Sequence, residues 1–218
     1  MLSKTEGTKR YEAALTACDS VAIVGPAPHL VGKGCGKEID GHELVVRINQ
    51  GSMLTSSYAA DFGSRVDLVY TDYNSIFRRF VAKGNLADDV IIVSTRDGVQ
   101  HPASIADARF QVTRETDNLN TGVRACLDAL KFTNIHRISV YGFSFYVEAE
   151  KYALPESEYL NIRLAEGITT EIHRQTPNVQ AFRRFAKDAR VYVHPLTKEA
   201  LTKTNRIFPE KSEDSSRV

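Results

Sequence analysis

Tryptophan is absent from this chain of 218 residues, and cysteine is scarce, occurring only at Cys18, Cys35 and Cys126. An odd number of cysteines without a metal-binding spacing argues against both a disulfide framework and a cysteine-based zinc site. Three reduced thiols are typical of a reducing compartment. We therefore expect a cytoplasmic chain.

Long apolar runs and a charge excess of either sign are also lacking. No stretch approaches the ~20 apolar residues of a membrane span, and residues 1–18 lack the apolar region of a signal peptide. Lys+Arg number 28 against 27 Asp+Glu, so the overall charge gives no reason to expect a nucleic-acid partner. A hydrophobic content of 42% suffices for one well-packed domain, predicted over residues 1–207, while residues 208–218 read as a disordered tail.

Short apolar segments alternate with segments of helical periodicity along most of the sequence. The expected strands are residues 20–25, 43–49, 66–70, 89–94, 109–113, 137–142 and 190–194. The expected helices are residues 8–18, 73–83, 121–131 and 177–188. This alternation predicts an α/β fold with a doubly wound, mostly parallel sheet. Residues 146–172 are long for a plain connection and are interpreted as a lid or substrate loop.

The most informative segment runs from Val21 to Asn49. A buried strand, Val21–Val24, leads into a Gly/Pro-rich loop, and a second strand ends in Asn49. A strand that enters a glycine loop places free backbone N–H groups at the carboxyl edge of the sheet, where phosphates bind in open α/β folds. Between the two strands stands Gly36-Lys37-Glu38-Ile39-Asp40, and the second strand reads Val46-Arg47-Ile48-Asn49.

These blocks resemble the large sialylmotif of the eukaryotic-type sialyltransferases, glycosyltransferase family 29. In that motif a strand, a glycine loop, Gly-x-Glu-Ile-Asp and Arg-hydrophobic-Asn follow one another in the same order. The later Asp61-Phe62-Gly63-Ser64-Arg65 is similar to the end of the motif. Residues 120–143, from Asn120-Thr121-Gly122 to Val140-Tyr141-Gly142-Phe143, resemble the small sialylmotif.

Two further features point the same way. Gly142-Phe143-Ser144-Phe145-Tyr146, with Tyr152 six residues later, is similar to the bacterial sialyltransferases of family 42. His173 precedes a predicted helix and a closing strand, where both families keep a catalytic histidine. The resemblance covers Val21 to Pro195 and implies a GT-A-like nucleotide-binding fold.

The sequence departs from the family pattern at three places. Pro26 stands where an Asn usually follows the first glycine, which removes one expected nucleotide contact. Val21 and Ile135 occupy the positions of the paired cysteines of the eukaryotic motifs. The His-Tyr-Tyr-Glu motif is not found, and Asn178 follows His173 where the family has Glu.

The resemblance implies transfer of a sialic-acid-like sugar from a CMP donor to a hydroxyl group, with inversion. His173 is the candidate general base, and Tyr146 and Tyr152 are candidates to donate hydrogen bonds to the leaving phosphate. The alternatives are a surface histidine in a loop and tyrosines that only pack. His194, with Glu199 at the His-x4-Glu spacing, is a second candidate base.

The predicted nucleotide-binding residues are Gly25, Pro26, Asn49, Asn120, Thr121, Gly122, Gly142 and Phe143. Tight turns and ordinary helix capping explain several of these residues equally well. Glu38 and Asp40 are expected to organise their loop rather than to catalyse. The basic residues Arg183, Arg184 and Lys187, with Arg78 and Arg79, either attract an anionic acceptor or form a solvated face.

The sequence thus predicts a soluble glycosyltransferase with a CMP-sugar donor and a glycan acceptor. Sialic acid and the related sugar Kdo both remain open as the transferred group. No cofactor or metal is expected, since no Asp-x-Asp motif lies at a strand end. The alternatives are a transferase for a different nucleotide-sugar and a non-catalytic CMP or glycan binder of the same fold.

Overall fold

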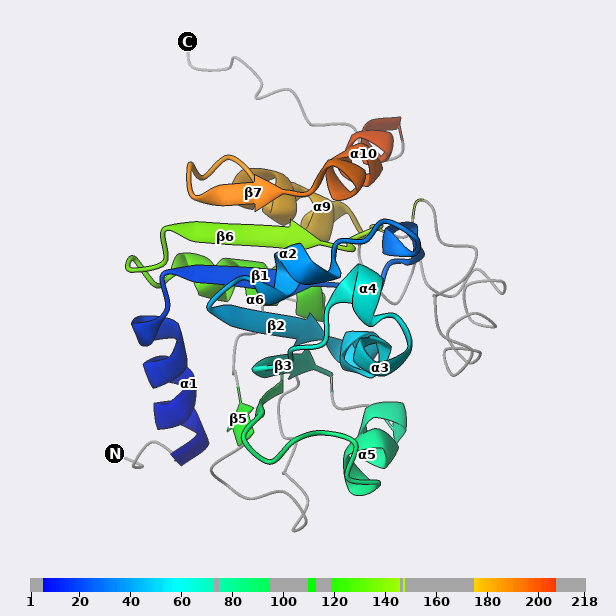
Figure 1. Cartoon of the computed structure of the whole chain (residues 1–218). Helices are drawn as coiled ribbons and strands as arrows, with labels where there is room; N and C mark the ends of the chain where they lie inside the picture. The colour runs from blue at the N-terminus through cyan, green and yellow to red at the C-terminus, as the bar shows by residue number, and fades with distance from the viewer. Residues whose placement is uncertain are drawn as a thin grey trace.

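A computed structural model of the chain describes residues 6–72, 75–94, 110–112, 119–145, 147 and 175–206. Its centre is a parallel sheet whose strands all point the same way (Figure 1). The strands are β1 (Ser20–Val24), β2 (Leu44–Ile48), β3 (Leu68–Thr71), β4 (Ile91–Ser94), β5 (Phe110–Val112), β6 (Arg137–Tyr141) and β7 (Val191–Val193).

Helices connect these strands and cover the sheet. The longer helices are α1 (Glu6–Ala17), α5 (Ser75–Ala82), α6 (Thr121–Leu130), α9 (Gln175–Phe185) and α10 (Pro195–Lys203). The short elements are η1 (Pro28–Leu30), α2 (Gly36–Asp40), η2 (Asn49–Met53), α3 (Leu54–Ser57), α4 (Ala59–Phe62) and η5 (Thr204–Arg206). None of the described helices is both long enough and apolar enough to cross a bilayer.

The strand order is β5-β4-β3-β2-β1-β6-β7, and every neighbouring pair is parallel. From β1 the chain builds outward to β5, then returns to add β6 on the other side of β1. The direction of winding therefore reverses between β1 and β6. In open parallel sheets this reversal marks the edge where ligands bind, outside the carboxyl ends of the two strands.

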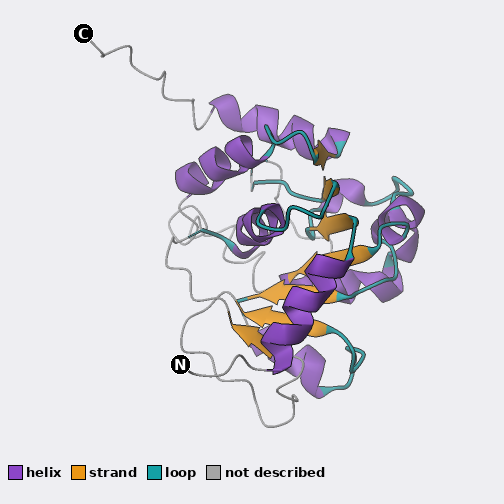
Figure 2. Cartoon of the chain, turned by 90° about the vertical axis from the view of Figure 1, so that its left-hand side faces the viewer, coloured by secondary structure: helices purple, strands orange, loops and turns teal. Residues whose placement is uncertain are grey.

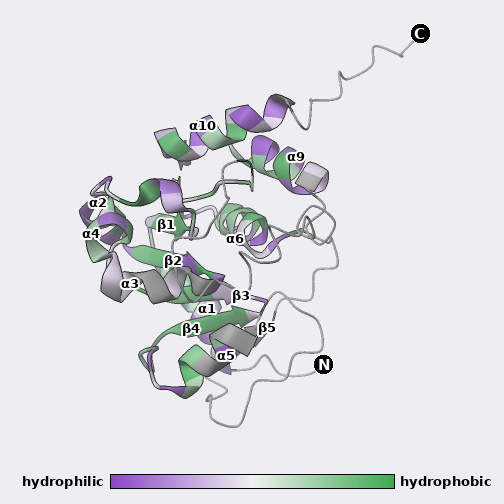
Figure 3. Ribbon diagram, turned by 90° about the vertical axis from the view of Figure 1, so that its right-hand side faces the viewer, coloured by the Kyte–Doolittle hydropathy of each residue, from purple (hydrophilic) through white to green (hydrophobic). Residues whose placement is uncertain are grey.

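Strands β1 to β4 are buried on both faces, as expected where helices cover each side of a sheet (Figure 2). In β1, Val21 and Ile23 pack into the core that α1, α6 and α9 share. Ala22 and Val24 point to the opposite face, where Ile39 of α2 and Phe62 of α4 lie. The strands are accordingly among the most hydrophobic parts of the chain (Figure 3).

The doubly wound parallel fold predicted from the sequence is confirmed, and most element boundaries shift by one to three residues. Helix α10 and the short elements η1, α2, η2, α3, α4 and η5 were not predicted. The loop expected around residues 61–65 begins as helix α4, and α10 follows the strand that was expected to close the fold. Pro195 at the first turn of α10, with Glu199 and Lys203 paired at 3.0 Å, was a usable helix signal. Residues 146, 148–174 and 207–218 lie outside the described part of the chain, including the predicted lid and tail.

At the switch point, the backbones that leave β1 and β6 touch. The N–H of Gly25 donates to the carbonyl of Tyr141 at 2.9 Å, and the N–H of Ala27 donates to that of Gly142 at 3.0 Å. A Cβ on Gly25 would lie 2.4 Å from the oxygen of Gly142, and a Cβ on Gly142 equally close to the oxygen of Gly25. Only glycine fits at either position, because that separation is far below van der Waals contact.

Gly142→Ala should therefore destabilise the fold much more than its backbone angle alone requires. Gly142 has φ +68°, and Gly84, at φ +71° with nothing within 4 Å of its virtual Cβ, is the matched control. We expect Gly84→Ala to lower the free energy of unfolding by about 1 kcal/mol, from backbone strain alone. Gly142→Ala adds a steric clash with backbone and should cost roughly 3 kcal/mol or more. Urea unfolding of both variants measures the difference, and equal losses would contradict the argument.

Candidate functional site

The turn after β1 carries no free N–H donor. The N–H groups of Gly25 and Ala27 are engaged by Tyr141 and Gly142, and Pro26 has none. The expectation that this turn presents free N–H groups to a phosphate is therefore wrong. What the turn offers a ligand is a closely approachable backbone.

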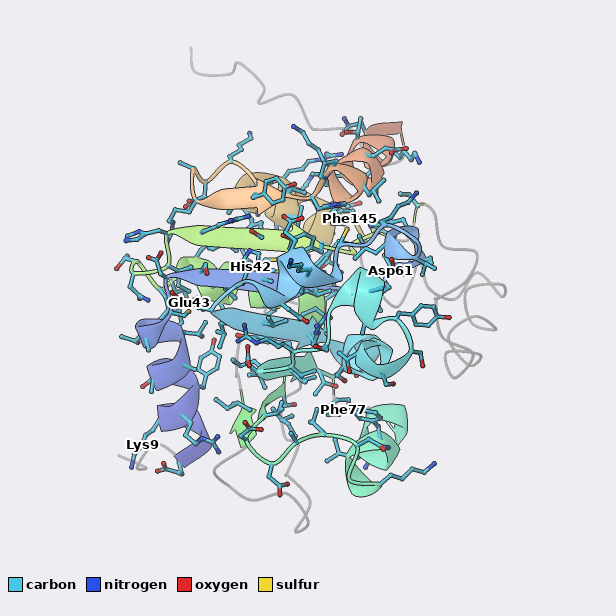
Figure 4. The ribbon with its side chains drawn as sticks, viewed as in Figure 1. Lys9, His42, Glu43, Asp61, Phe77 and Phe145 are labelled. Carbon is cyan, nitrogen blue, oxygen red and sulfur yellow. The ribbon has the colours of Figure 1, made fainter. Side chains whose placement is uncertain are left out.

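The rest of the glycine loop binds an internal carboxylate. The N–H of Gly34 donates to Oδ1 of Asp61 at 2.9 Å. Hydrogen bonds from Gly34, Gly32 and Lys33 hold the pKa of Asp61 below its usual value. Gly32 and Gly34 both have positive φ, at +76° and +66°. Such a run of N–H groups forms a nest for anions, and here the chain's own carboxylate fills it (Figure 4).

Asn49 lies directly after β2, in the left-handed region at φ +47°. Its Oδ1 accepts a hydrogen bond from the N–H of Asp72, which follows β3, at 3.1 Å. This contact fixes the amide group, and among the described residues Nδ2 has no acceptor. A virtual Cβ on Gly51 of η2 lies 3.3 Å from the carbonyl of Val24, so the segment that follows Asn49 rests against the end of β1. Asn49 thus offers one oriented donor at the carboxyl edge.

Helix α6 begins at the same edge. Asn120 is its N-cap, and Oδ1 accepts from the N–H of Val123 at 2.9 Å. Among the described residues, the N–H of Gly122 has no acceptor, as is usual in the first turn of a helix. The positive end of the helix dipole and this N–H together favour an anion at this position.

Gly122 is also where α6 meets the segment after β6. A Cβ there would lie 2.7 Å from the ring of Phe143. The ring of Phe143 is 5.7 Å from that of Phe182 in α9. Phe145, buried at φ +50°, packs edge-on against Phe182 at 4.8 Å. These aromatic contacts join the start of α6, the end of β6 and α9, and place Gly122 beside Phe143.

The predicted binding residues are thus brought to one edge of the sheet, although they come from four separate segments. Gly25 and Ala27, on either side of Pro26, contact the turn at Tyr141 and Gly142. Asn49 follows the neighbouring strand, and Gly122, next to Asn120 and Thr121, lies against Phe143. The predicted catalytic residues His173, Tyr146 and Tyr152 lie outside the described residues.

The second candidate base, His194, lies at the same edge but has no carboxylate partner among the described residues. Its Nε2 is 3.6 Å from Sγ of Cys35, and its ring lies 5.4 Å from that of Tyr141. Glu199 pairs with Lys203 at 3.0 Å instead. Burial lowers the pKa of His194. The His-x4-Glu spacing therefore does not produce a His–Glu pair here.

The most specific sequence block, around Asp40 and Arg47, forms a hydrogen-bonded cluster within the fold rather than a set of ligand contacts. Arg47 is fully buried, and its guanidinium donates to the carbonyls of Phe62 and Arg65, the latter through Nε at 2.9 Å and Nη2 at 2.6 Å. Oδ1 of Asp40 lies 3.8 Å from Nη2 of Arg47. Burial lowers the pKa of Arg47 to about 10, so the guanidinium stays charged at neutral pH. Arg47 thereby joins β2 to the segment that ends α4.

Asp40, at the end of α2, is the second member of this hydrogen-bonded cluster. Its carboxylate accepts hydrogen bonds from the N–H and hydroxyl of Ser64, at 2.7 and 2.9 Å, and from the N–H of Arg65 at 3.0 Å. These bonds hold the pKa of Asp40 below its usual value despite partial burial, which acts in the opposite direction. Glu38 accepts from the hydroxyl of Tyr141 at 2.8 Å. The expectation that Glu38 and Asp40 organise their loop is confirmed.

Two polar side chains at this level of the fold hold elements together. His42 is buried, with Nε2 2.8 Å from the hydroxyl of Ser139, and burial lowers its pKa. Arg183 was assigned to a possible solvated face, but it is buried and donates to Thr204 Oγ1 at 2.8 Å, which fastens α9 to the end of α10. In the part of the chain that the structure describes, no three His, Cys, Asp or Glu side chains cluster as metal ligands would.

Replacing Arg47 should disrupt this hydrogen-bonded cluster without altering the proposed ligand-binding edge. Arg47→Met leaves the carbonyls of Phe62 and Arg65 without their buried donor, and should lower the free energy of unfolding by about 3 kcal/mol. Arg10→Met removes an exposed guanidinium that donates to the carbonyl of Asp89, and should change it by less than about 0.5 kcal/mol. Urea titration compares the two, and a loss at Arg47 no larger than at Arg10 would refute the structural role.

Known proteins give an independent comparison. Residues 2–99 match the family model of glycosyltransferase family 29 (sialyltransferase). A crystal structure of a mammalian sialyltransferase in complex with Gal-beta-1-3GalNAc-ortho-nitrophenol shares 18% identity, with a TM-score of 0.41, over 62% of this chain and 58% of that chain. A second mammalian sialyltransferase structure shares 16% identity, with a TM-score of 0.39, over 85% of this chain and 72% of that one.

The chain therefore spans less than two thirds of the first of these solved structures. The family match includes the glycine loop, the Glu38–Asp40 turn, Arg47 and Asn49, which are the residues that first suggested the resemblance. The resemblance to the sialyltransferases is confirmed by this match over residues 2–99.

Proposed function

We propose that this chain is a metal-independent, inverting glycosyltransferase. It transfers sialic acid, or a related sugar such as Kdo, from a CMP donor to a hydroxyl group of a glycan. One observation carries the proposal beyond the family match. Residues 120–143 lie outside the matched segment, yet the edge they form joins that of Gly25 and Asn49 at the switch point of the sheet.

The donor phosphate would be held by α6 and Asn49. The N–H of Gly122, at the positive end of α6, and Nδ2 of Asn49 are two donors at this edge without an acceptor among the described residues. Both are neutral dipoles fixed in place by other contacts, which suits charge that grows on a leaving phosphate. No metal ion or other cofactor is required in this scheme.

In the reaction, the acceptor oxygen forms a bond to the anomeric carbon while the bond from that carbon to the phosphate oxygen breaks. CMP leaves with the electron pair, and the acceptor proton passes to His173. Tyr146 and Tyr152 donate hydrogen bonds to the departing phosphate. These three roles rest on the sequence resemblance, and His173 stands two residues ahead of α9 in the chain.

CMP should bind and stabilise the protein, whereas UDP, GDP and NAD should not. A ligand at 100 times its Kd raises the free energy of unfolding by about 2.7 kcal/mol, which thermal denaturation detects readily. Asn49→Asp keeps the acceptor for the N–H of Asp72, but replaces the Nδ2 donor by a negative oxygen. We expect this variant to bind CMP at least about tenfold more weakly at an unchanged Tm.

Asn85→Asp makes the same chemical change at an exposed site, where Nδ2 donates to the carbonyl of Phe80, and should leave CMP affinity unchanged. If Asn49→Asp and Asn85→Asp bind CMP alike, Asn49 does not contact the nucleotide. Preference for UDP or GDP would favour the alternative of a different nucleotide-sugar donor.

His173→Ala should abolish most turnover and spare binding. Loss of a general base lowers the rate by about 10²–10⁴-fold, while CMP affinity should stay within a few-fold of the wild type. His194→Ala tests the second candidate, and should retain turnover, since His194 packs against Cys35 and Tyr141. The assay follows CMP release from CMP-sialic acid and CMP-Kdo with a panel of glycans.

The outcomes separate the remaining functions. Loss of turnover in His194→Ala but not in His173→Ala would move the base to His194. CMP binding without release from either donor would favour the non-catalytic binder, and neither binding nor release would refute the proposal.

A further inference from the structure

Asn120, the N-cap of α6, is held from two sides. Its own side chain accepts from Val123, and its backbone N–H donates to Oδ1 of Asn178 at 2.6 Å. Asn178 belongs to α9, lies 58 residues further along the chain, and is only 1% exposed. A buried amide acceptor thus ties the first turn of α9 to the first turn of α6.

The hydrogen bond between Asn120 and Asn178 sets the backbone orientation of Asn120, which the other contacts at this edge do not fix. Gly122 is fixed against Phe143, but the N-cap that precedes it has non-helical backbone angles, φ −69° and ψ 158°. Without an acceptor for its N–H, this half-buried residue would lose the bond that selects its orientation. Reorientation of Asn120 would also release Val123, and with it the geometry of the first turn.

We propose that Asn178 is a positioning residue for the nucleotide phosphate. It fixes the start of α6 through Asn120, and it does so with a neutral acceptor. This inference rests on the proposed function, because the anion it serves is the CMP phosphate. An Asp at this position, with the same side-chain length, would accept the same hydrogen bond, but would place a buried negative charge at the end of α6 where the phosphate is proposed to bind.

Because Asn178 is uncharged, the change from the family's Glu to Asn at this position is compatible with the proposed phosphate site. The sialyltransferase resemblance predicts Glu where the chain has Asn178. In this chain Asn178 fixes the start of α6, beside the proposed nucleotide site, and this role is distinct from orienting the general base. Its variants should therefore act on ligand affinity, and should separate the phosphate from the nucleoside.

Asn178→Ala is the first test, with Asn134→Ala as its matched control. Asn134 also links elements through its amide, donating to the carbonyls of Leu15 and Cys18 at 2.8 Å, but it precedes β6 and lies at the opposite edge of the sheet. Both variants lose a side-chain-to-backbone contact. Calorimetric titration with CMP should give a Kd about tenfold higher for Asn178→Ala and an unchanged Kd for Asn134→Ala. Equal Kd values for the two would overturn the inference.

Asn178→Asp is the second test, and it stays informative if the alanine variant fails to fold. It keeps the acceptor for Asn120, so cytidine should bind as in the wild type, whereas CMP should bind about tenfold more weakly, with a deficit that shrinks at high salt. Unchanged CMP affinity, or equal weakening of CMP and cytidine, would overturn the role of the neutral acceptor. A wild-type protein that binds no CMP would instead refute the proposed function, and this inference with it.

Discussion

The contact between Gly25 and Gly142 is the constraint on which the rest of this edge depends. Parallel strands β1 and β6 end side by side, and the backbones leave them within hydrogen-bond distance of each other. Any side chain at either position would force the two turns apart, by more than the adjacent bonds allow. The closeness brings the first half of the chain, with Asn49, against the second half, with α6 and Phe143. The two halves can meet at this candidate site only because these two positions lack a Cβ.

The sequence block that carries the family resemblance has a different physical role from the edge it supports. Arg47, Asp40 and Arg65 bind backbone groups of one another's segments, and these hydrogen bonds do not reach the turn at Gly25. A buried guanidinium that donates to two carbonyls is expensive to desolvate, and is tolerated only where each donor has a partner. Removing any member leaves a buried polar group unmatched. Such an arrangement admits few substitutions, which explains why structural residues give the clearest motif.

The sequence predicted the parallel sheet and nearly all its strands because β-branched runs such as Val21–Val24 are buried on both faces and so are uniformly apolar. It also predicted the edge at which the candidate binding residues meet, since the carboxyl ends of parallel strands lie together there. It failed on hydrogen-bond partners. That Asp61 fills the glycine loop, that Asn178 binds Asn120, and that His194 contacts Cys35 rather than Glu199 all depend on distances between residues far apart in the sequence. Periodicity and spacing carry no information about such pairings.

The filled glycine loop also decides where a phosphate is favoured. Asp61 keeps its negative charge to lower pH than usual, because the N–H groups of Gly34, Gly32 and Lys33 stabilise the carboxylate. A phosphate that approached this loop would have to displace that carboxylate or bind beside it, and both are opposed by like-charge repulsion. At the start of α6, by contrast, the acceptor Asn178 is a neutral amide and the helix dipole attracts an anion. On these grounds a phosphate is favoured at the start of α6 rather than in the glycine loop.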